Sequence, residues 1–300
     1  MDSYHIPVMA SQCIEALNIQ KGGIYVDATF GGGGHSKLIL DNKNVDKLFG
    51  IDQDHDAIKN KWDDQRLIII NHNYRYMKQF LKYHKAVPVD GILADLGISS
   101  YQINEGSKGF SYRFDERLDM RMDKDDEIDA VYVLNEYTET ELTRVFNSYG
   151  EISKSHYLAR SIVQYRRGKS IKNVQDLLDS IKSETPKIGD YAFYSKVFQA
   201  IRIEVNNELI NLELFLKQCK DVLKPDGRLV IMSYHSLEDR CVKNFINTGN
   251  TEGALIKDDF GNVLRPFKPL NKKPIVPDNA EVAQNPRARS AKLRIAIRTK

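Results

Sequence analysis

The chain has 300 residues, of which 41% are hydrophobic and 28% are charged, and its formal net charge is +3. This length fits one large domain with an added part, since a single hydrophobic core rarely grows beyond ~250–300 residues. Three scattered cysteines without metal-ligand spacing, no signal-peptide pattern and no apolar run of membrane-spanning length argue against a disulfide framework, a metal site and a membrane partner, so a cytoplasmic protein is expected.

The first predicted strand and the turn after it indicate a nucleotide-binding domain. Apolar residues from Ile24 to Val26 are followed by Asp27, four glycines at 31–34 and a helix start at Ser36. In α/β domains such a unit binds a nucleotide at the carboxyl end of the strand. The dinucleotide fingerprint and the P-loop do not fit, because their later Gly or Gly-Lys positions are missing. An acid before the glycine turn is typical of S-adenosylmethionine (SAM) methyltransferases, and a plain tight turn is the alternative.

The second predicted strand, 47–52, ends in a candidate ribose ligand. Asp52 lies 25 residues after Asp27, close to the offset at which a carboxylate of these folds accepts hydrogen bonds from ribose hydroxyls. A helix N-cap is the alternative for Asp52. Asp54 and Asp56 can serve as that cap instead, so the ribose contact is favoured.

The next two predicted strands lead to an aromatic residue and a second acid. The strand 66–71 is apolar throughout, which indicates burial on both faces. Tyr74 beyond it is expected to pack against adenine or, alternatively, in the core. The strand 89–97 brings Asp95 to the edge where active sites of open α/β sheets lie. Asp95 and the carbonyl groups from Leu96 to Ser99 can accept the N–H bonds of a substrate amine, or Asp95 can contact only the methionine amino group of SAM.

The middle of the chain is predicted to be helical. It has no convincing parallel strand, and four segments show the apolar spacing of helices: 139–149, 155–166, 174–184 and 194–205. The α/β pattern then resumes, which favours an insertion over a separate second domain. We therefore expect a discontinuous SAM-binding domain, residues 1–103 and 206–300, with a helical insert over residues 104–205 that helps to recognise RNA.

An amphipathic helix at 208–222, a turn at 224–227 and a strand at 228–234 follow the insert. The strand runs into Tyr234 and His235, whose ring and polar groups suit the floor of a pocket for a planar base. Ordinary packing at a strand end is the alternative, and it competes more strongly for Tyr234 than for His235.

The positions of Cys13, Cys219 and Cys241 exclude one reaction. Methylation of a pyrimidine at carbon 5 needs a thiolate nucleophile. None of the three cysteines falls at the end of the strand 89–97 or of the strand 228–234. Transfer to nitrogen or oxygen remains.

The end of the chain is basic. From Arg265 to Lys300 there are ten Lys and Arg residues against two Asp and Glu residues. Residues 291–298 alternate apolar and basic side chains, which predicts a strand with one buried and one cationic face. A basic segment on a nearly neutral protein indicates a phosphate-bearing partner. A solvated tail is the alternative.

Seven motifs, in order, resemble those of one family: Tyr4–Met9, Val26–Ser36, Asp90–Ser100, Leu118–Asp123, Val197–Ile203, Ser233–Arg240 and Asn285–Arg294. Together they look like the RsmH (MraW) family of bacterial 16S ribosomal RNA cytosine-N4 methyltransferases, which act at the decoding centre. The resemblance spans nearly the whole chain.

The resemblance implies a class I methyltransferase fold with an inserted helical domain, SAM as methyl donor and 16S rRNA of the small ribosomal subunit as partner. Carried over by position, it implies cofactor contacts from Gly33, Gly34, His35, Asp52, Tyr74, Asp95 and Gln102. The candidate catalytic residues are Asp95, Ser99, Tyr234 and His235. Phosphate contacts are expected from Arg287, Arg289, Lys292 and Arg294.

The chain departs from the family pattern at a few positions. The family usually has Phe at the position of Tyr74, which retains a ring, and Glu-Arg at Ser107 and Lys108. Exchange of Arg for Lys puts a bidentate contact there in doubt. Asn104 and Asn207 stand where Asp is more usual.

Three other functions fit these residues less well. A 2′-O-methyltransferase needs a base, typically Lys, to activate a ribose hydroxyl, and the strand 89–97 has no Lys at its end. A non-catalytic RNA-binding assembly factor is the alternative from a different class, and the intact glycine run, Asp52 and Asp95 argue against it. A nicotinamide dehydrogenase is excluded by the missing third glycine. The sequence does not decide between a monomer and a homodimer.

Overall fold

The computed structural model describes residues 7–98, 108–186 and 190–299. The chain forms two compact units, one of Met1–Gly97 with Leu209–Lys300 and one of Ile98–Glu208. We call them the sheet unit and the helical unit. The predicted boundaries, at 103/104 and 205/206, lie a few residues from these.

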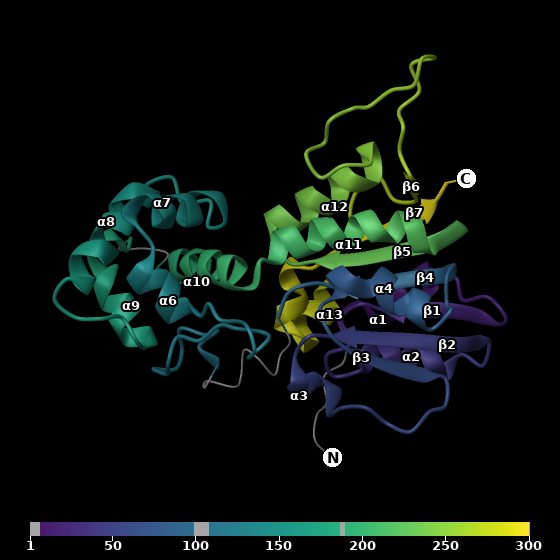
Figure 1. Ribbon diagram of the computed structural model, residues 1–300, viewed down its shortest axis with the longest axis horizontal. Helices are drawn as coiled ribbons and strands as arrows, with labels where there is room; N and C mark the ends of the chain where they lie inside the picture. Colours follow the sequence, from purple (N-terminus) through teal and green to yellow (C-terminus); the bar gives the residue numbers. More distant parts are fainter. Residues whose placement is uncertain (1–6, 99–107, 187–189, 300) are drawn as a thin grey trace. The chain divides into compact units, whose positions relative to one another are not determined.

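A seven-stranded sheet forms the centre of the sheet unit, with the order β3-β2-β1-β4-β5-β7-β6 (Figure 1). The strands are β1 (Gly23–Asp27), β2 (Val45–Asp52), β3 (Leu67–Asn71), β4 (Val89–Asp95), β5 (Leu223–Ser233), β6 (Phe267–Pro269) and β7 (Lys292–Arg298). β1 to β5 run parallel, and β7 runs antiparallel to β5 and β6. The predicted mostly parallel sheet is confirmed, and the ends of β1, β2 and β4 share one edge.

Helices cover both faces of this sheet because its strands carry apolar side chains on both sides. One core packs α4 (Met77–Tyr83), α11 (Glu208–Val222) and α12 (Ser236–Thr248) against one face. A second core packs α1 (Ala10–Leu17), α2 (Gly34–Asp41) and the 3₁₀ turn η4 (Pro286–Ser290) against the other. The shorter elements are α3 (His55–Ile58), η1 (Tyr74–Tyr76) and α13 (Asn279–Gln284).

The predicted turn at 224–227 lies inside β5 and not before it. β5 already begins at Leu223, which pairs with Val89 of β4, and the next pair along the strand is Gly91 with Arg228. The extra residues bulge out of the ladder, and Asp226 has a left-handed backbone, with a φ of 66°. The Pro-Asp-Gly signal was therefore correct about local conformation, but β4 extends the pairing on both sides of it.

The helical unit has a core of its own, built from the apolar faces of its helices. These are α6 (Ala130–Glu136), α7 (Glu139–Ser148), α8 (Ser155–Arg166), α9 (Val174–Ser180), the 3₁₀ turn η3 (Lys182–Glu184) and α10 (Asp190–Asn206). The described residues of this unit form no strand. α6 was not predicted, because it begins with the continuous apolar run Ala130–Leu134, which shows no helical alternation of apolar and polar residues. Its start is fixed by Asp129, whose side chain accepts the Tyr132 N–H at 2.7 Å.

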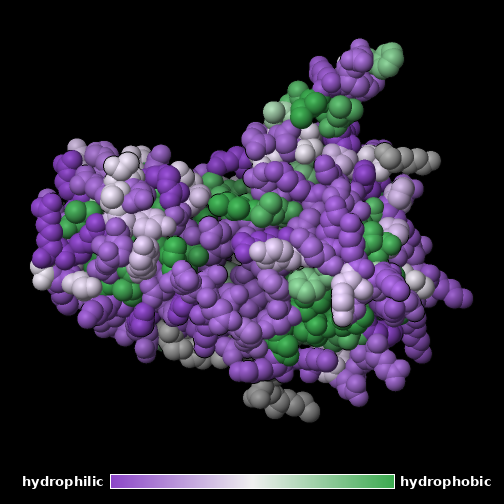
Figure 2. Space-filling model, viewed as in Figure 1, coloured by the Kyte–Doolittle hydropathy of each residue, from purple (hydrophilic) through white to green (hydrophobic). Residues whose placement is uncertain are grey.

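The visible surface in Figure 2 is mostly hydrophilic, with apolar residues gathered in small groups. In the part of the chain that the structure describes, no helix combines the length and the apolar character needed to cross a bilayer. The loop between α12 and β6 exposes several apolar side chains, including Leu255, Ile256 and Phe260.

Candidate active site

Side chains from other segments lie close to the backbone of the glycine turn after β1. Gly33 has a φ of 73°, and a Cβ added there would lie 2.7 Å from the ring of Trp62 and 3.1 Å from that of Phe30. The two rings stack with centroids 5.9 Å apart. A Cβ on Gly34 would lie 3.3 Å from Pro7. Gly33 must therefore be glycine for both its conformation and its surroundings.

Asp27, at the end of β1, makes hydrogen bonds to residues of the glycine turn and of α2. It is buried and accepts hydrogen bonds from the Ser36 hydroxyl at 2.7 Å and from the Thr29 N–H at 3.2 Å. Burial raises the pKa of this carboxyl, while the nearby His35 and the hydrogen bond from Ser36 act in the opposite direction. These bonds connect the strand end to the first turn of α2, so Asp27 fixes the geometry of the glycine turn.

Asp52, at the end of β2, is held by two backbone groups. One carboxylate oxygen accepts the Gly31 N–H at 2.8 Å, and the other accepts the Asp54 N–H at 2.9 Å. Asp54 itself caps α3 by accepting the Asp56 N–H at 3.0 Å. Burial raises the pKa of Asp52 to about 6, although both backbone bonds lower it. A helix N-cap was the alternative role for Asp52. Asp54 fills that role, at the start of α3.

Tyr74 begins η1, directly after β3. Its ring meets Phe215 of α11 edge to face, with the centroids 5.0 Å apart, and packs against the core on that side of the sheet. This contact favours the core alternative for part of the ring. The expected adenine contact stays a prediction.

Asp95 lies at the end of β4, and its groups contact three segments. Its N–H donates to Thr29 Oγ1 at 2.7 Å, and its Oδ1 accepts the Tyr234 hydroxyl at 2.7 Å. Its Oδ2 lies 3.8 Å from His35 Nδ1, and the side chain is 24% exposed. Burial raises the pKa of Asp95 to about 6, against the lowering effects of His35 and the Tyr234 bond. The site thus holds a fixed carboxylate with one oxygen turned toward an imidazole.

His35 connects Asp95 to the N-terminal segment. Its buried ring donates from Nε2 to the Val8 carbonyl oxygen at 3.1 Å, while Nδ1 faces Asp95. The bond to Val8 fixes the ring orientation, so His35 presents a defined edge to the carboxylate.

The structure separates the roles of Tyr234 and His235. Burial next to the Asp95 carboxylate raises the pKa of Tyr234 well above its usual value, so this phenol remains a donor. His235 is the N-cap of α12: its side chain and that of Glu238 each accept a backbone N–H of the other's residue. Its Nε2 lies 3.2 Å from Glu238 Oε1. A purely structural role is therefore better supported for His235 than for Tyr234. The sequence had suggested that this alternative competes more strongly for Tyr234.

Two predicted site residues, Ser99 and Gln102, lie outside the described residues. Asn104, Ser107 and the first motif residues Tyr4–Ile6 lie outside them as well.

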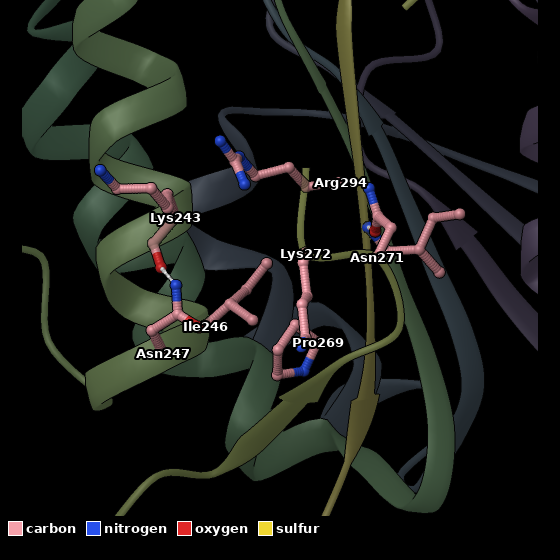
Figure 3. Close-up of a pocket in the computed structure, with 8 residues that line it drawn as sticks. Lys243, Ile246, Asn247, Pro269, Asn271, Lys272 and Arg294 are labelled. Atoms are coloured by element: carbon pink, nitrogen blue, oxygen red, sulfur yellow. Dashed lines mark hydrogen bonds between the residues drawn. The ribbon is translucent and has the colours of Figure 1, made fainter. Parts of the chain in front are cut away.

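The cationic face expected for the last strand is only partly exposed. Arg294 of β7 is 8% exposed, and its Nε lies 2.6 Å from a carboxylate oxygen of Asp239, which Lys292 also approaches at 3.5 Å. The guanidinium of Arg294 (Figure 3) is buried in an ion pair within the sheet unit, so it does not belong to an exposed cationic face, and its contact with RNA stays a prediction. Arg287 and Arg289 lie on η4, and Arg289 is exposed.

Sequence reasoning missed several residues that shape the site. Thr29 and Trp62 gave no signal, because their contacts join segments far apart in the chain. The His-x-x-Glu spacing from His235 to Glu238 did carry a signal, since it is that of a capping box.

The strand order reverses between β1 and β4, and a ligand of an open α/β sheet binds outside the strand ends at such a point. The glycine turn and Asp95 lie there, with Asp52 on the next strand, which is the arrangement of a class I methyltransferase. Residues 2–299 match the model of the MraW methylase family, and the chain belongs to that family.

Named relatives cover almost the whole chain. The ribosomal RNA small subunit methyltransferase H of Phocaeicola vulgatus is 49% identical over 294 residues, which are 98% of this chain and 97% of the relative. That of Flavobacterium johnsoniae is also 49% identical, over 98% of this chain and 97% of the relative. That of Amoebophilus asiaticus is 47% identical, over 99% of this chain and 96% of the relative.

Proposed function

We propose that this chain transfers the methyl group of SAM to the exocyclic N4 of a cytidine in the decoding region of 16S rRNA. The observation that carries the proposal is the Asp95 carboxylate, which Thr29 and Tyr234 fix beside the glycine turn. Relatives 47–49% identical over nearly the full chain carry the name of small-subunit rRNA methyltransferases. That name supports rRNA of the small subunit as the substrate.

The residues of the sheet unit fit SAM as the donor. The glycine turn lies at the end of β1 and leaves its backbone open at Gly31, where an added Cβ would meet only the Thr29 carbonyl oxygen, at 3.8 Å, so a ligand can approach the backbone closely there. The Asp52 carboxylate retains lone pairs for ribose hydroxyls beyond the two that its backbone bonds use. When bound, SAM supplies an electrophilic methyl group on a sulfonium. We propose that Gly33, Gly34, His35, Asp52 and Asp95 contact it, with Tyr74 and Gln102 completing the set.

Asp95 is the residue that we propose to orient the substrate amine. A carboxylate that accepts an N–H of the amine directs the nitrogen lone pair away from itself and toward the methyl carbon. As the new N–C bond forms and the C–S bond breaks, the amine proton passes to Asp95 Oδ2 or to solvent. Tyr234 occupies the other oxygen, which leaves Oδ2 for this purpose. Alignment contributes most of the rate because the methyl is already activated.

The substrate base must reach a carboxylate at the edge of the sheet. A cytidine in structured RNA is therefore expected to unstack and enter the site alone. Arg287, Arg289 and Lys292 are proposed to contact phosphates, which position RNA without reading its sequence. The helical unit is proposed to contribute to RNA recognition, and the cytoplasm, where ribosomal subunits assemble, is the proposed location.

A 2′-O-methyltransferase is disfavoured by the end of β4. The described residues that follow Asp95 are Leu96, Gly97 and Ile98, and none of them can deprotonate a ribose hydroxyl.

The experiment supplies labelled SAM to small ribosomal subunits from a strain lacking this gene. Label should enter 16S rRNA with the unmodified protein and fall at least tenfold with Asp52→Ala, which removes the ribose ligand. Calorimetry of SAM binding on both proteins separates the possibilities. A protein that binds rRNA but neither binds SAM nor transfers label would instead be a binding factor.

A further inference from the structure

The connection between α3 and β3, residues 59–66, lies against the glycine turn, and we call it the strap. Both of its ends are anchored in the sheet unit. At the start, the Asn60 N–H donates to the Ala57 carbonyl oxygen at 3.0 Å, which continues the turn of α3. At the other end, Arg66 Nη2 donates to the Leu40 carbonyl oxygen of α2 at 2.7 Å. The residues between these anchors therefore have defined places.

One contact of the strap reaches the backbone of the glycine turn. The Asn60 side chain donates from Nδ2 to the Gly31 carbonyl oxygen at 3.1 Å. The N–H of the same glycine donates to Asp52 Oδ2 at 2.8 Å. Side chains from two other segments thus hold both polar groups of Gly31. Its φ of 51° lies in the left-handed region, which a glycine both enters and leaves easily, so these bonds decide whether the conformation persists.

Trp62, the single tryptophan of the chain, makes the other contact. Its ring stacks on that of Phe30, with the centroids 5.9 Å apart and 23° between the planes. A Cβ added to Gly33 would lie 2.7 Å from the Trp62 ring. The Lys37 ammonium of α2 lies 5.3 Å from the centroid of that ring, within the range of a cation–π contact. The indole is therefore packed between the end of β1 and the start of α2.

These two contacts bear on ligand binding because the turn consists of glycines. A glycine loses more conformational freedom on ordering than any other residue. Where the fold has already ordered the backbone, a ligand that binds there does not have to order it, and its affinity is higher. The strap orders the turn from the side that faces away from the sheet.

We propose that Asn60 and Trp62 are positioning residues for the cofactor, which hold the glycine turn in the conformation that binds SAM. This inference rests on the proposed contacts between that turn and SAM. Since Asn60 and Asp52 hold the two sides of Gly31, loss of Asn60 also loosens the carboxylate proposed to bind the ribose. Both residues act on the turn, so they set the affinity for SAM and not the rate of methyl transfer from bound SAM.

The first test compares Asn60→Ala with Asn44→Ala, which shortens an exposed asparagine elsewhere in the sheet unit. SAM binding is measured by calorimetry, and kcat and KM are measured for methyl transfer. We expect Asn60→Ala to bind SAM about tenfold more weakly, with the KM for SAM raised to match and kcat at saturating SAM unchanged. Asn44→Ala should alter none of these. A merely structural role would lower the thermal unfolding temperature without separating KM from kcat.

The second test compares Trp62→Phe with Trp62→Ala. Phe keeps a ring that can stack on Phe30, so Trp62→Phe should bind SAM nearly as the unmodified protein does. Trp62→Ala opens a gap beside the turn and should bind SAM about tenfold more weakly. Tyr83→Ala, which removes a side chain that is 82% exposed, is the control and should not change the affinity. Thermal unfolding curves ensure that every variant is measured while folded.

Two results would overturn the inference. SAM affinities of Asn60→Ala and Trp62→Ala equal to those of their controls would show that the strap does not position the turn. A fall in kcat at saturating SAM with an unchanged KM would show that the strap acts on the chemical step instead. Failure of the unmodified protein to methylate 16S rRNA would remove the proposed function, whereas the comparison of SAM affinities would still decide this inference.

Discussion

At the scale of single residues, the site depends on carboxylates in places where ionisation is costly. Asp52 and Asp95 both have a pKa raised to about 6 by burial. A carboxyl group poised near neutral pH can accept a hydrogen bond or a proton from a substrate amine. Keeping Asp95 charged in a buried place lowers the free energy of unfolding of the sheet unit. The position of Asp95 in the site explains this cost.

Asp95→Asn should stabilise the protein at neutral pH. The native-state pKa of Asp95, about 6, exceeds the ordinary value of 3.8, so the native state binds more protons in the intervening window and the free energy of unfolding falls as pH rises through it. Asn keeps the shape and accepts the Tyr234 hydroxyl without the charge. Urea unfolding should show a gain of about 1–3 kcal/mol at pH 7.5 that shrinks toward zero near pH 4. A loss of stability at pH 7.5 would contradict the assignment.

Tyr234→Phe should move the pH dependence of methyl transfer. The Tyr234 hydroxyl lowers the pKa of Asp95, so its removal raises that pKa further. The acidic limb of kcat/KM, expected near pH 6, should shift to higher pH. Tyr83→Phe, at a side chain that is 82% exposed, is the matched control. An unchanged limb in Tyr234→Phe would show that Asp95 does not govern it.

At the scale of elements, the start of α12 places Tyr234 by means of His235 and Glu238. Glu238 Oε2 accepts the Tyr234 N–H at 2.9 Å and the His235 N–H at 3.3 Å. The side chain of His235 in turn accepts the Glu238 N–H at 3.4 Å. This reciprocal cap satisfies donors at the helix start, so the N–H and Nδ1 of His235 are used to hold the strand end, whereas its buried Nε2 has no hydrogen-bond partner among the described residues.

His235→Asn should therefore retain activity. Asn is a favourable N-cap, whereas His235→Ala should lower the free energy of unfolding by about 1 kcal/mol. Thermal unfolding and kcat are measured for both variants. A His235→Asn protein that folds and binds SAM normally but no longer transfers methyl would show that His235 contacts the substrate.

Gly33→Ala should disturb the glycine turn more than Gly31→Ala. Both positions have a positive φ, and a left-handed backbone costs a residue with a Cβ about 1–2 kcal/mol. A Cβ at Gly31 meets only the Thr29 carbonyl oxygen, at 3.8 Å, whereas one at Gly33 collides with Trp62. SAM affinity measured by calorimetry should fall further in Gly33→Ala. Equal losses would mean that backbone conformation alone matters.

Strands were predictable from the sequence where their apolar runs are long, and the acids at the ends of β2 and β4 followed from those strands. The bulge in β5 was not predictable, because the pairing of Leu223 with Val89 decides it. α6 begins with a continuous apolar run and η1 has three residues, so neither shows a helical period. These elements depend on contacts between distant segments, which the spacing of residues in the sequence does not reveal.

At the scale of the whole molecule, the chain consists of two units, each with its own hydrophobic core. The resumption of strand patterns after the helices was sufficient to predict a discontinuous sheet. The places of Asp52 and Asp95 at the ends of β2 and β4 were predictable, because topology fixes them. The surroundings of Arg294 were not predictable, because alternation along β7 indicates a cationic face but does not reveal its bond to the Asp239 carboxylate on α12.

The proposed role of Asp95 is to direct methyl transfer to a cytosine amine. It is tested most directly by nucleoside analysis of 16S rRNA from small subunits that have been treated with labelled SAM and either the unmodified protein or Asp95→Asn. We predict label in N4-methylcytidine with the unmodified protein and loss of that label with Asp95→Asn, whose fold is checked by its unfolding curve. Label in a 2′-O-methyl or carbon-5 product, or undiminished N4-methylcytidine from Asp95→Asn, would contradict the account.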